Sequence, residues 1–247
     1  MKADVLYQQL PVTVRSTLER GRAHIEKPYL KKFYSQFVKS DDLVFDIGAN
    51  MGDYAEVFLE LGAQVICLEP QPRCLDIINK KFAGNENITV IGKGVGNSKG
   101  VLPFYVSSQN HATSTFSEKY KKEGPFNNRT WDKTIDVEIT TIDDLISAYG
   151  VPAFCKIDVE GYEKYVFEGL HSIIPIISFE YTSSLVEDTV ACLKLLENQS
   201  NLKINLSVHP YHRLELPEWT NDITKVAHVI NKQKMSPSGD IYVKLSE

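Results

Sequence analysis

The sequence has 247 residues, of which 43% are hydrophobic and 24% charged, so a globular fold is expected rather than a disordered or fibrous chain. This length is enough for one large α/β domain or two small ones. The formal net charge of −5 disfavours a protein that grips a nucleic-acid backbone through a basic face, and no nucleic-acid partner is expected.

Residues 1–39 place apolar side chains at helical spacing among lysine, arginine and glutamate. The apolar positions are Leu18, Ile25, Tyr29, Phe33 and Phe37. The spacing predicts an N-terminal helical extension of one or two helices, packed on a single domain that spans residues 40–247. The first residues lack the apolar core of a signal peptide, and no apolar run is long enough to cross a membrane.

Strands and helices alternate from residue 43 onward. The expected elements are strands at 43–47, 64–69 and 88–92, with helices at 53–62 and 72–82. Turn residues followed by an extended run predict a hairpin-like excursion at 94–106. The Ser-, Asn- and Lys-rich residues 107–132 predict a surface loop, which should overhang the cleft at the strand ends.

The second half of the chain continues the alternation. The expected strands are 134–140, 153–158, 173–181, 203–208 and 240–245, and the expected helices are 142–150, 159–171 and 185–199. This order predicts a mostly parallel, Rossmann-like sheet with helices on both faces. The long insertion between the last two strands predicts an antiparallel edge.

The four cysteines form no CxxC pair, and two of them lie inside apolar, strand-like runs. They are Cys67, Cys74, Cys155 and Cys192. Buried, reduced thiols are therefore expected rather than a zinc site or disulfides, and a cytoplasmic location is the expectation that follows.

The segment "VFDIGANMGDY" (44–54) is the first candidate site, because ligands of such sheets bind beyond the carboxyl ends of the strands. Gly48 and Gly52 would let the backbone approach a ligand, and Asn50 tolerates a positive φ. Glu69 ends the second strand, where a carboxylate can accept hydrogen bonds from both ribose hydroxyls. A G-x-N-x-G turn followed at once by Asp53 disfavours the pyrophosphate of NAD and favours the cationic S-adenosylmethionine.

Four motifs in this order resemble the FkbM family of S-adenosylmethionine-dependent methyltransferases. They are "VFDIGANMGDY", "LEPQP" (68–72), "CKIDVEGYEKYVFEGL" (155–170) and "SFEY" (178–181), within residues 40–182. The resemblance implies the class I methyltransferase fold, a seven-stranded sheet of order 3-2-1-4-5-7-6 whose last strand is antiparallel. It also implies O-methylation of a hydroxyl on a sugar, a glycan or another small-molecule natural product.

The resemblance further assigns the cofactor contacts. Asp46, Gly48, Ala49, Asn50 and Gly52 would surround the methionine part of S-adenosylmethionine, with Asp158 beside it. Glu69, followed by Pro70, would hold the ribose. The residue type usual after the third strand is acidic, and here the chain reads "GKGVGN", so the adenine is expected at the backbone of Val95 and at Asn97.

Carboxylates gather at the strand ends where the chemistry is expected. Asp158 ends the fourth strand, Glu160 follows it, and Glu180 ends the fifth. One of these acids could be the general base that takes the hydroxyl proton. Alternatively, Asp158 and Glu180 could hold Mg²⁺ and lower the hydroxyl pKa, although the metal-free base is favoured. Glu163 is interpreted as an acid that complements the dipole of the following helix.

Histidines offer a second set of candidate bases. His111 lies in the loop over the cleft, and His209 and His212 follow the sixth strand. The acceptor pocket is expected to come from residues 107–132 and 209–238, where Trp131, Tyr211 and Trp219 could stack on a sugar or merely pack.

Two rival functions remain open. Nucleic-acid amino-methylation usually needs a [DNS]PP[YFW] motif after the fourth strand, where this chain has "IDVEG", and no Pro-Cys nucleophile for C5-methylation is present. The short basic run "KYKKEG" (119–124) is interpreted as a solvated loop. The other rival is a non-catalytic module that binds S-adenosylmethionine without transferring the methyl group.

Overall fold

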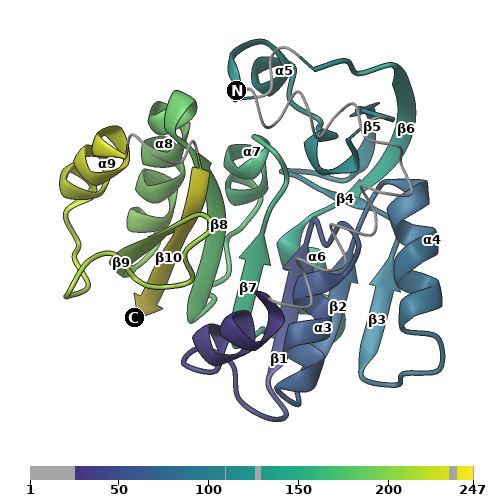
Figure 1. Ribbon diagram of the computed structural model, residues 1–247, viewed down its shortest axis with the longest axis horizontal. Coiled ribbons are helices and arrows are strands. Elements are labelled where there is room, and N and C mark those ends of the chain that lie inside the picture. Colours follow the sequence, from purple (N-terminus) through teal and green to yellow (C-terminus); the bar gives the residue numbers. More distant parts are fainter. Residues whose placement is uncertain (1–25, 109, 126–128, 234–237, 247) are drawn as a thin grey trace.

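The computed structural model describes residues 26–108, 110–125, 129–233 and 238–246. The part of the predicted N-terminal extension before residue 26, including Leu18 and Ile25, lies outside the described residues. Figure 1 shows a central sheet with helices packed against it and a smaller sheet beside one end. Within the described residues, no helix is both long enough and apolar enough to cross a membrane.

The central sheet has seven strands, and its topology confirms the predicted class I methyltransferase fold. The strands are β1 (Leu43–Ile47), β2 (Gln64–Leu68), β3 (Ile88–Ile91), β7 (Phe154–Ile157), β8 (Ile176–Thr182), β9 (Asn201–Val208) and β10 (Ser238–Ser246). Their order is β3-β2-β1-β7-β8-β10-β9. The β10 strand is antiparallel to both neighbours, while the pairs from β3 to β8 are parallel.

Alternate residues of the strands face two separate cores, as the period of two requires. Phe45 and Ile47 of β1 face one core, which α6 (Ile142–Tyr149), α7 (Glu163–Glu168), α8 (Val186–Glu197) and α9 (Ile223–Lys232) cover. Val44 faces the other core, which the helix at 26–34, α3 (Asp53–Glu60) and α4 (Pro72–Lys81) cover. Proline at the first position of α4 fits its prediction as a helix start.

The helix at 26–34 is part of the second core rather than a loose appendage. Phe33, Tyr34 and Phe37 pack edge-on or stacked against rings of the central sheet, and the Phe37 and Phe154 ring centroids lie 5.9 Å apart. Lys27 also pairs with Glu56 of α3 at 2.9 Å. This part of the predicted extension therefore packs on the domain that follows it.

A second sheet of three strands corrects the predicted hairpin at 94–106. Its strands are β4 (Gly94–Val95), β5 (Gly100–Val106) and β6 (Lys133–Thr140), in the order β4-β6-β5. The chain does reverse between β4 and β5, but β6 lies between them and takes the hydrogen bonds of both. A distant strand thus completes a pairing that local turn signals assigned to neighbours.

The predicted surface loop at 107–132 is wrong for much of its described length. It contains a short helix, η1 (His111–Thr113), and the helix α5 (Glu118–Glu123), whose Tyr120 is fully buried. The polar side chains that suggested solvent exposure bond within the protein instead. Ser117 accepts a hydrogen bond from Tyr120 N as the cap of α5, and Asn110 accepts one from Ala112 N as the cap of η1. We call residues 107–108 and 110–123 the roof segment.

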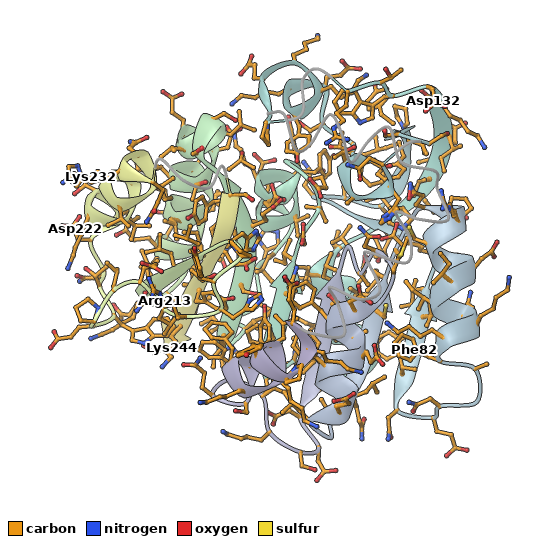
Figure 2. The ribbon with its side chains drawn as sticks, viewed as in Figure 1. Phe82, Asp132, Arg213, Asp222, Lys232 and Lys244 are labelled. Atoms are coloured by element: carbon orange, nitrogen blue, oxygen red, sulfur yellow. The ribbon has the colours of Figure 1, made fainter. Side chains whose placement is uncertain are left out.

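No bounds were predicted for α9, which lies in the insertion between the last two strands and contains His228, a residue that the sequence already indicates to be helical. Asp222 and Lys232 mark its two ends in Figure 2, and the Asp222 side chain caps it by accepting from Lys225 N at 3.0 Å. Residues 234–237 of this insertion lie outside the described part. All four cysteines are free and buried, as predicted.

Candidate functional site

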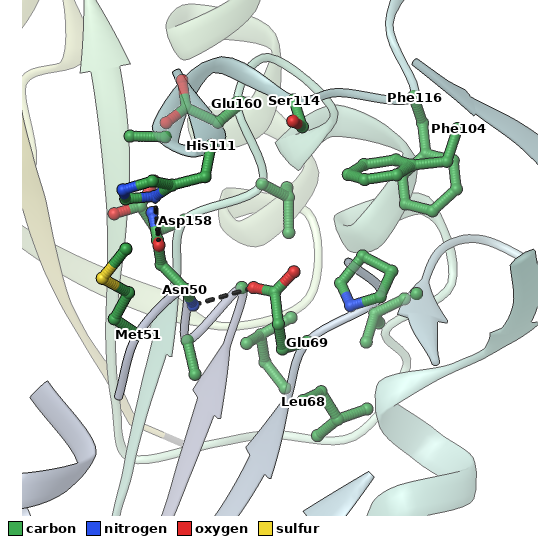
Figure 3. A pocket seen from close by; sticks show the side chains of 18 of the residues that line it. Asn50, Met51, Leu68, Glu69, Phe104, His111, Ser114, Phe116, Asp158 and Glu160 are labelled. Carbon is green, nitrogen blue, oxygen red and sulfur yellow. Dashed lines mark hydrogen bonds between the residues drawn. The ribbon is translucent and has the colours of Figure 1, made fainter. Parts of the chain in front are cut away.

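A cavity of about 360 Å³ lies beyond the carboxyl ends of β1, β2 and β7, beneath the roof segment. This is where the strand order changes direction, the usual binding crevice of such sheets. Residues 47–51, 53 and 54 line it after β1, residues 68–70 after β2, and residues 158–160 after β7. Residues 93–95 and roof residues such as Asn110 and His111 complete the lining. Figure 3 shows these groups converging on one space.

The turn after β1 has three residues in the left-handed region. They are Gly48 (φ 81°), Asn50 (φ 51°) and Gly52 (φ 74°), so the predicted positive φ of Asn50 is present. A Cβ on Gly48 would lie 1.8 Å from the backbone oxygen of Asp158. One on Gly52 would lie 2.8 Å from the Phe82 ring. Both glycines thus serve close packing within the protein, and only Gly48 lines the cavity.

Glu69 is tied to the turn after β1. Its Oε2 accepts a hydrogen bond from Asn50 N at 2.8 Å, and its Oε1 accepts one from Gln71 N at 2.7 Å. Burial raises the pKa of Glu69 to about 7, against the lowering effect of these two N–H groups. The carboxylate faces the cavity in Figure 3, where it can accept hydrogen bonds from hydroxyl groups.

Asp46 lies beneath the turn rather than in the cavity lining. It is 1% exposed, and neither carboxylate oxygen forms a hydrogen bond of good geometry to another described residue. The nearby Ala55 N–H still lowers the pKa of Asp46. Burial dominates and raises the pKa of Asp46 to about 6. A buried acid without a full set of partners favours a cationic neighbour.

The far end of the cavity is apolar and suits a planar ring. Pro70, Val95, Phe104 and Phe116 line it, and the two phenylalanine ring centroids lie 4.6 Å apart (Figure 3). Asn97, predicted to contact adenine, is not brought into this group. Its amide donates to Glu168 at 3.3 Å on the exposed side of the chain.

These features fit S-adenosylmethionine. The cavity volume falls within the usual range for small-molecule sites. An apolar end for the adenine, Glu69 for hydroxyls, and acids around the β1 turn for the positive charges all occur in one space. Ala49, Asn50 and Asp158 all line this cavity.

The three predicted acids meet beside the cavity. One oxygen from each of Asp158, Glu160 and Glu180 lies within 4.8 Å of the others, although Glu180 does not line the cavity itself. Burial first, and then the charge of Asp158, raise the pKa of Glu160 well above its usual value. Burial and the charge of Glu160 do the same for Glu180.

Of these three acids, Asp158 and Glu160 line the cavity, and each of the two accepts a hydrogen bond from a neighbouring side chain. Lys156 Nζ donates to Asp158 Oδ2 at 2.7 Å, which confirms that the two side chains share one side of β7. The Tyr120 hydroxyl donates a short hydrogen bond to Glu160 Oε2. Glu160 also has φ 53°, a conformation that few non-glycine residues adopt.

Glu163 has the structural role that its position suggested. Its Oε1 accepts from Val159 N and Gly161 N, both at 3.2 Å, at the start of α7. It closes the turn that carries Asp158 and Glu160.

The candidate histidines separate into two groups. His111 lines the cavity, and its Nδ1 lies 2.7 Å from Asn50 Oδ1. His209 lies outside the lining, with Nε2 3.0 Å from Asp240 Oδ2 and Nδ1 3.3 Å from Ser238 Oγ. Burial lowers the pKa of His209, but the charge of Asp240 and its hydrogen bond to the ring together outweigh burial, and the pKa is raised. His212 packs near Phe33, with ring centroids 6.5 Å apart.

The aromatic candidates mostly pack. Trp131 Nε1 donates to Thr113 O at 2.8 Å and holds the roof segment. Trp219 lies edge-on to Phe37, with Lys244 4.2 Å from its ring centroid. Tyr211 is 54% exposed.

Sequence reasoning missed several lining residues, among them Tyr54, Lys93, Phe104 and Phe116. Tyr54 follows the glycine turn directly and could have been found from that position. Phe104 comes from the segment predicted as a hairpin, which no local signal placed here. Phe116 comes from the segment predicted to overhang the cleft, although no signal singled out this residue.

Comparisons of the sequence match this chain to methyltransferases. A family model described as the methyltransferase FkbM domain matches residues 46–220. The 2-O-methyltransferase NoeI of Sinorhizobium fredii is 25% identical over 224 residues, which cover 85% of this chain and 90% of that protein. A chloroplastic ribosomal RNA small subunit methyltransferase of Arabidopsis thaliana is 35% identical over 54 residues, 22% of this chain and 16% of that protein.

Among solved structures, precorrin-6y C5,15-methyltransferase of Geobacter metallireducens aligns with a TM-score of 0.45 and 11% identity. The alignment covers 90% of this chain and 87% of that chain.

Proposed function

The chain belongs to the FkbM methyltransferase domain family, and on that premise we propose that it methylates a hydroxyl group of a sugar, a glycan or another small molecule. As a member of this family it is a methyltransferase that uses S-adenosylmethionine. The finer proposal, O-methylation, draws support from the similarity to the 2-O-methyltransferase NoeI along most of both chains.

The proposed cofactor contacts follow the lining of the cavity. Gly48, Ala49 and Asn50 hold the methionine part, and Glu69 accepts hydrogen bonds from the ribose hydroxyls. The adenine lies at the apolar end beside Pro70 and Val95. When bound, the cofactor supplies a methyl group on a positively charged sulfur, an electrophile that an oxygen nucleophile can attack.

The observation that carries the proposal is Asp158, a carboxylate that lines the cavity with one oxygen held by Lys156. An alcohol is a poor nucleophile until its proton is removed, so a carboxylate in this place can act as the general base. In the overall reaction the hydroxyl oxygen gains the methyl group, its proton passes to Asp158, and S-adenosylhomocysteine leaves. His111 is the second candidate base, because it lines the same cavity.

We favour a base without a metal ion. Asp158 Oδ2 already accepts from a lysine ammonium, and Glu160 Oε2 accepts from Tyr120, so two oxygens of the acidic group are engaged by protein donors. A divalent cation would have to compete with Lys156 for Asp158.

Methylation of RNA is the main rival and has less support. The local acids and the net charge of −5 would repel phosphates near the site. The similarity to the chloroplastic RNA methyltransferase covers only 22% of this chain.

A transfer screen tests the proposal. Radiolabelled S-adenosylmethionine is incubated with the protein and, in parallel, with oligosaccharides, small alcohols or ribosomal RNA. Label in a carbohydrate or alcohol fraction supports the proposal, and label in RNA alone contradicts it. Tight cofactor binding by calorimetry with no transfer to any fraction would instead favour a non-catalytic binding module.

A further inference from the structure

Lys156 is a buried lysine that lies behind the cavity without lining it. Its side chain is 1% exposed and comes from the middle of the central sheet. Burying an ammonium is costly unless it is well paired, and an apolar side chain of similar size would serve stability at least as well. Its presence therefore calls for a role besides packing.

The contacts of Lys156 lead to two residues that do line the cavity. Its Nζ donates to Asp158 Oδ2 at 2.7 Å and lies 4.3 Å from the centre of the Tyr54 ring. Both Asp158 and Tyr54 line the cavity. One cation thus fixes a carboxylate from β7 and, through its attraction to the aromatic face, a ring from α3.

The second oxygen of Asp158 remains available to the cavity. Oδ1 forms no hydrogen bond to another residue in the described part of the chain, and the Asp158 side chain is 25% exposed. With Oδ2 held, the carboxylate has one orientation, and its unpaired oxygen is the one that can meet a ligand. Asp46 lies opposite Lys156 on β1 and adds a second negative charge behind the pair.

We propose that Lys156 is a positioning residue of the methyl-transfer site, which holds Asp158 and Tyr54 in place and balances the charge that Asp158 presents to the cofactor. The inference rests on the proposed function of Asp158. Lys156 touches neither cofactor nor acceptor, and it acts through the side chain it holds.

A double-variant cycle tests this coupling without needing an acceptor. The variants are Lys156→Met, Asp158→Asn and the two combined. Lys164→Met is the control, because among the described residues Lys164 pairs with Glu168 on the exposed side of α7. Calorimetry gives the ratio of affinities for S-adenosylmethionine, which carries the sulfonium charge, and S-adenosylhomocysteine, which does not. In Lys156→Met an unbalanced Asp158 should shift the ratio toward S-adenosylmethionine by at least about fivefold.

The same change made in the Asp158→Asn background should shift the ratio much less, because the main charge through which Lys156 acts is gone and that of Asp46 lies farther behind the cavity. A ratio unchanged by Lys156→Met, or an equal shift in both backgrounds, would overturn the proposal. If Lys156→Met fails to fold, the combined variant leaves no buried charge unpaired between these two positions. Recovery of folding in the combined variant, with a ratio within about twofold of that in Asp158→Asn, supports the coupling, and a larger shift overturns it.

Turnover then separates this inference from the proposed function. With an acceptor found in the screen, Lys156→Met should lower kcat at least about tenfold with little change in the KM for the acceptor, and no further loss should appear in the Asp158→Asn background. If the wild type transfers no methyl group to any hydroxyl, the proposed function fails, while the affinity ratio still decides the role of Lys156.

Discussion

The amide oxygen of Asn50 lies 2.7 Å from Nδ1 of His111, so the turn after β1 is bonded to the roof segment across the cavity. Because an amide oxygen can only accept, Nδ1 carries the hydrogen, and Nε2 of the neutral ring is a proton acceptor. The contact joins the floor and the roof of the proposed cofactor site. We therefore expect binding of the cofactor to depend on two segments far apart in the sequence.

Gly48→Ala should disrupt the site. The new Cβ would meet the backbone oxygen of Asp158 at 1.8 Å, and the residue has φ 81°. We expect loss of S-adenosylmethionine binding by calorimetry and a lower melting temperature. Gly84→Ala is the matched control, since Gly84 has φ 79° but no atom within 4 Å of an added Cβ. Equal effects of the two variants would show that only backbone strain matters.

Glu69→Gln should weaken cofactor binding and remove its pH dependence. Loss of charge-assisted hydrogen bonds costs about 1.5–3 kcal/mol. Burial raises the pKa of Glu69 from 4.5 to about 7, so its contribution to folding stability falls as pH rises between these values. Cofactor affinity should rise as the pH passes through about 7, because the ionised carboxylate of Glu69 is the better hydrogen-bond acceptor. Calorimetry at pH 6 and 8 checks this, and the same slope in the variant would exclude Glu69 as the cause.

Ser114→Ala should loosen the roof segment. Ser114 Oγ accepts hydrogen bonds from Gln71 Nε2 at 2.9 Å and from Ser107 N at 3.1 Å, and all three residues are buried. Leaving these donors unpaired costs about 1–3 kcal/mol. We expect faster dissociation of S-adenosylhomocysteine in stopped-flow measurements, with transfer reduced. This variant is preferable to deleting the segment, because deletion would also remove the buried Tyr120.

His209→Gln should change stability more than catalysis. Both ring nitrogens face protein partners. The pKa of His209 is raised above 6.5 because the charge of Asp240 and its hydrogen bond together outweigh burial. The stabilisation is fully present below pH 6.5 and is lost as pH rises through the higher folded-state pKa. Urea unfolding should show a larger deficit in the variant at pH 6 than at pH 9. A larger deficit at pH 9 would contradict this assignment.

Asp158→Asn should reduce turnover at least about a hundredfold, the lower range for loss of acid–base catalysis. Cofactor affinity should change much less, because Glu69 and the turn after β1 supply most of the binding. EDTA should leave the wild type active if the base works without a metal ion. Inhibition by EDTA that added Mg²⁺ reverses would favour the metal instead, and wild-type turnover in the variant would move the search for the base to His111.

The sheet could be predicted from the sequence because each strand is short, apolar and bounded by turn residues. The strand order came from the family resemblance, while the antiparallel β10 was indicated both by the resemblance and by the long insertion before it. Asn50 and Glu69 were predictable since they stand at fixed places after β1 and β2. The pairing of β6 with both β4 and β5 was not, because it depends on contacts between distant segments.

Polar composition misled the prediction at the roof segment. Ser114, Thr115 and Ser117 bond to other protein groups and are buried, although the same letters are typical of exposed loops. Asn97 was assigned to adenine from its place after the third strand, yet the turn before β5 directs its amide to Glu168. At the roof segment and at Asn97, the direction of the side chain decides what it contacts, and a sequence pattern does not specify that direction.

The most direct measurement follows the methyl carbon itself. The protein is incubated with S-adenosylmethionine labelled with ¹³C in the methyl group and with the acceptor fraction found in the screen, and the product is examined by NMR. The account predicts a labelled methyl group bonded to oxygen, formed by the wild type and nearly absent with Asp158→Asn. A labelled methyl group on nitrogen or carbon would contradict it.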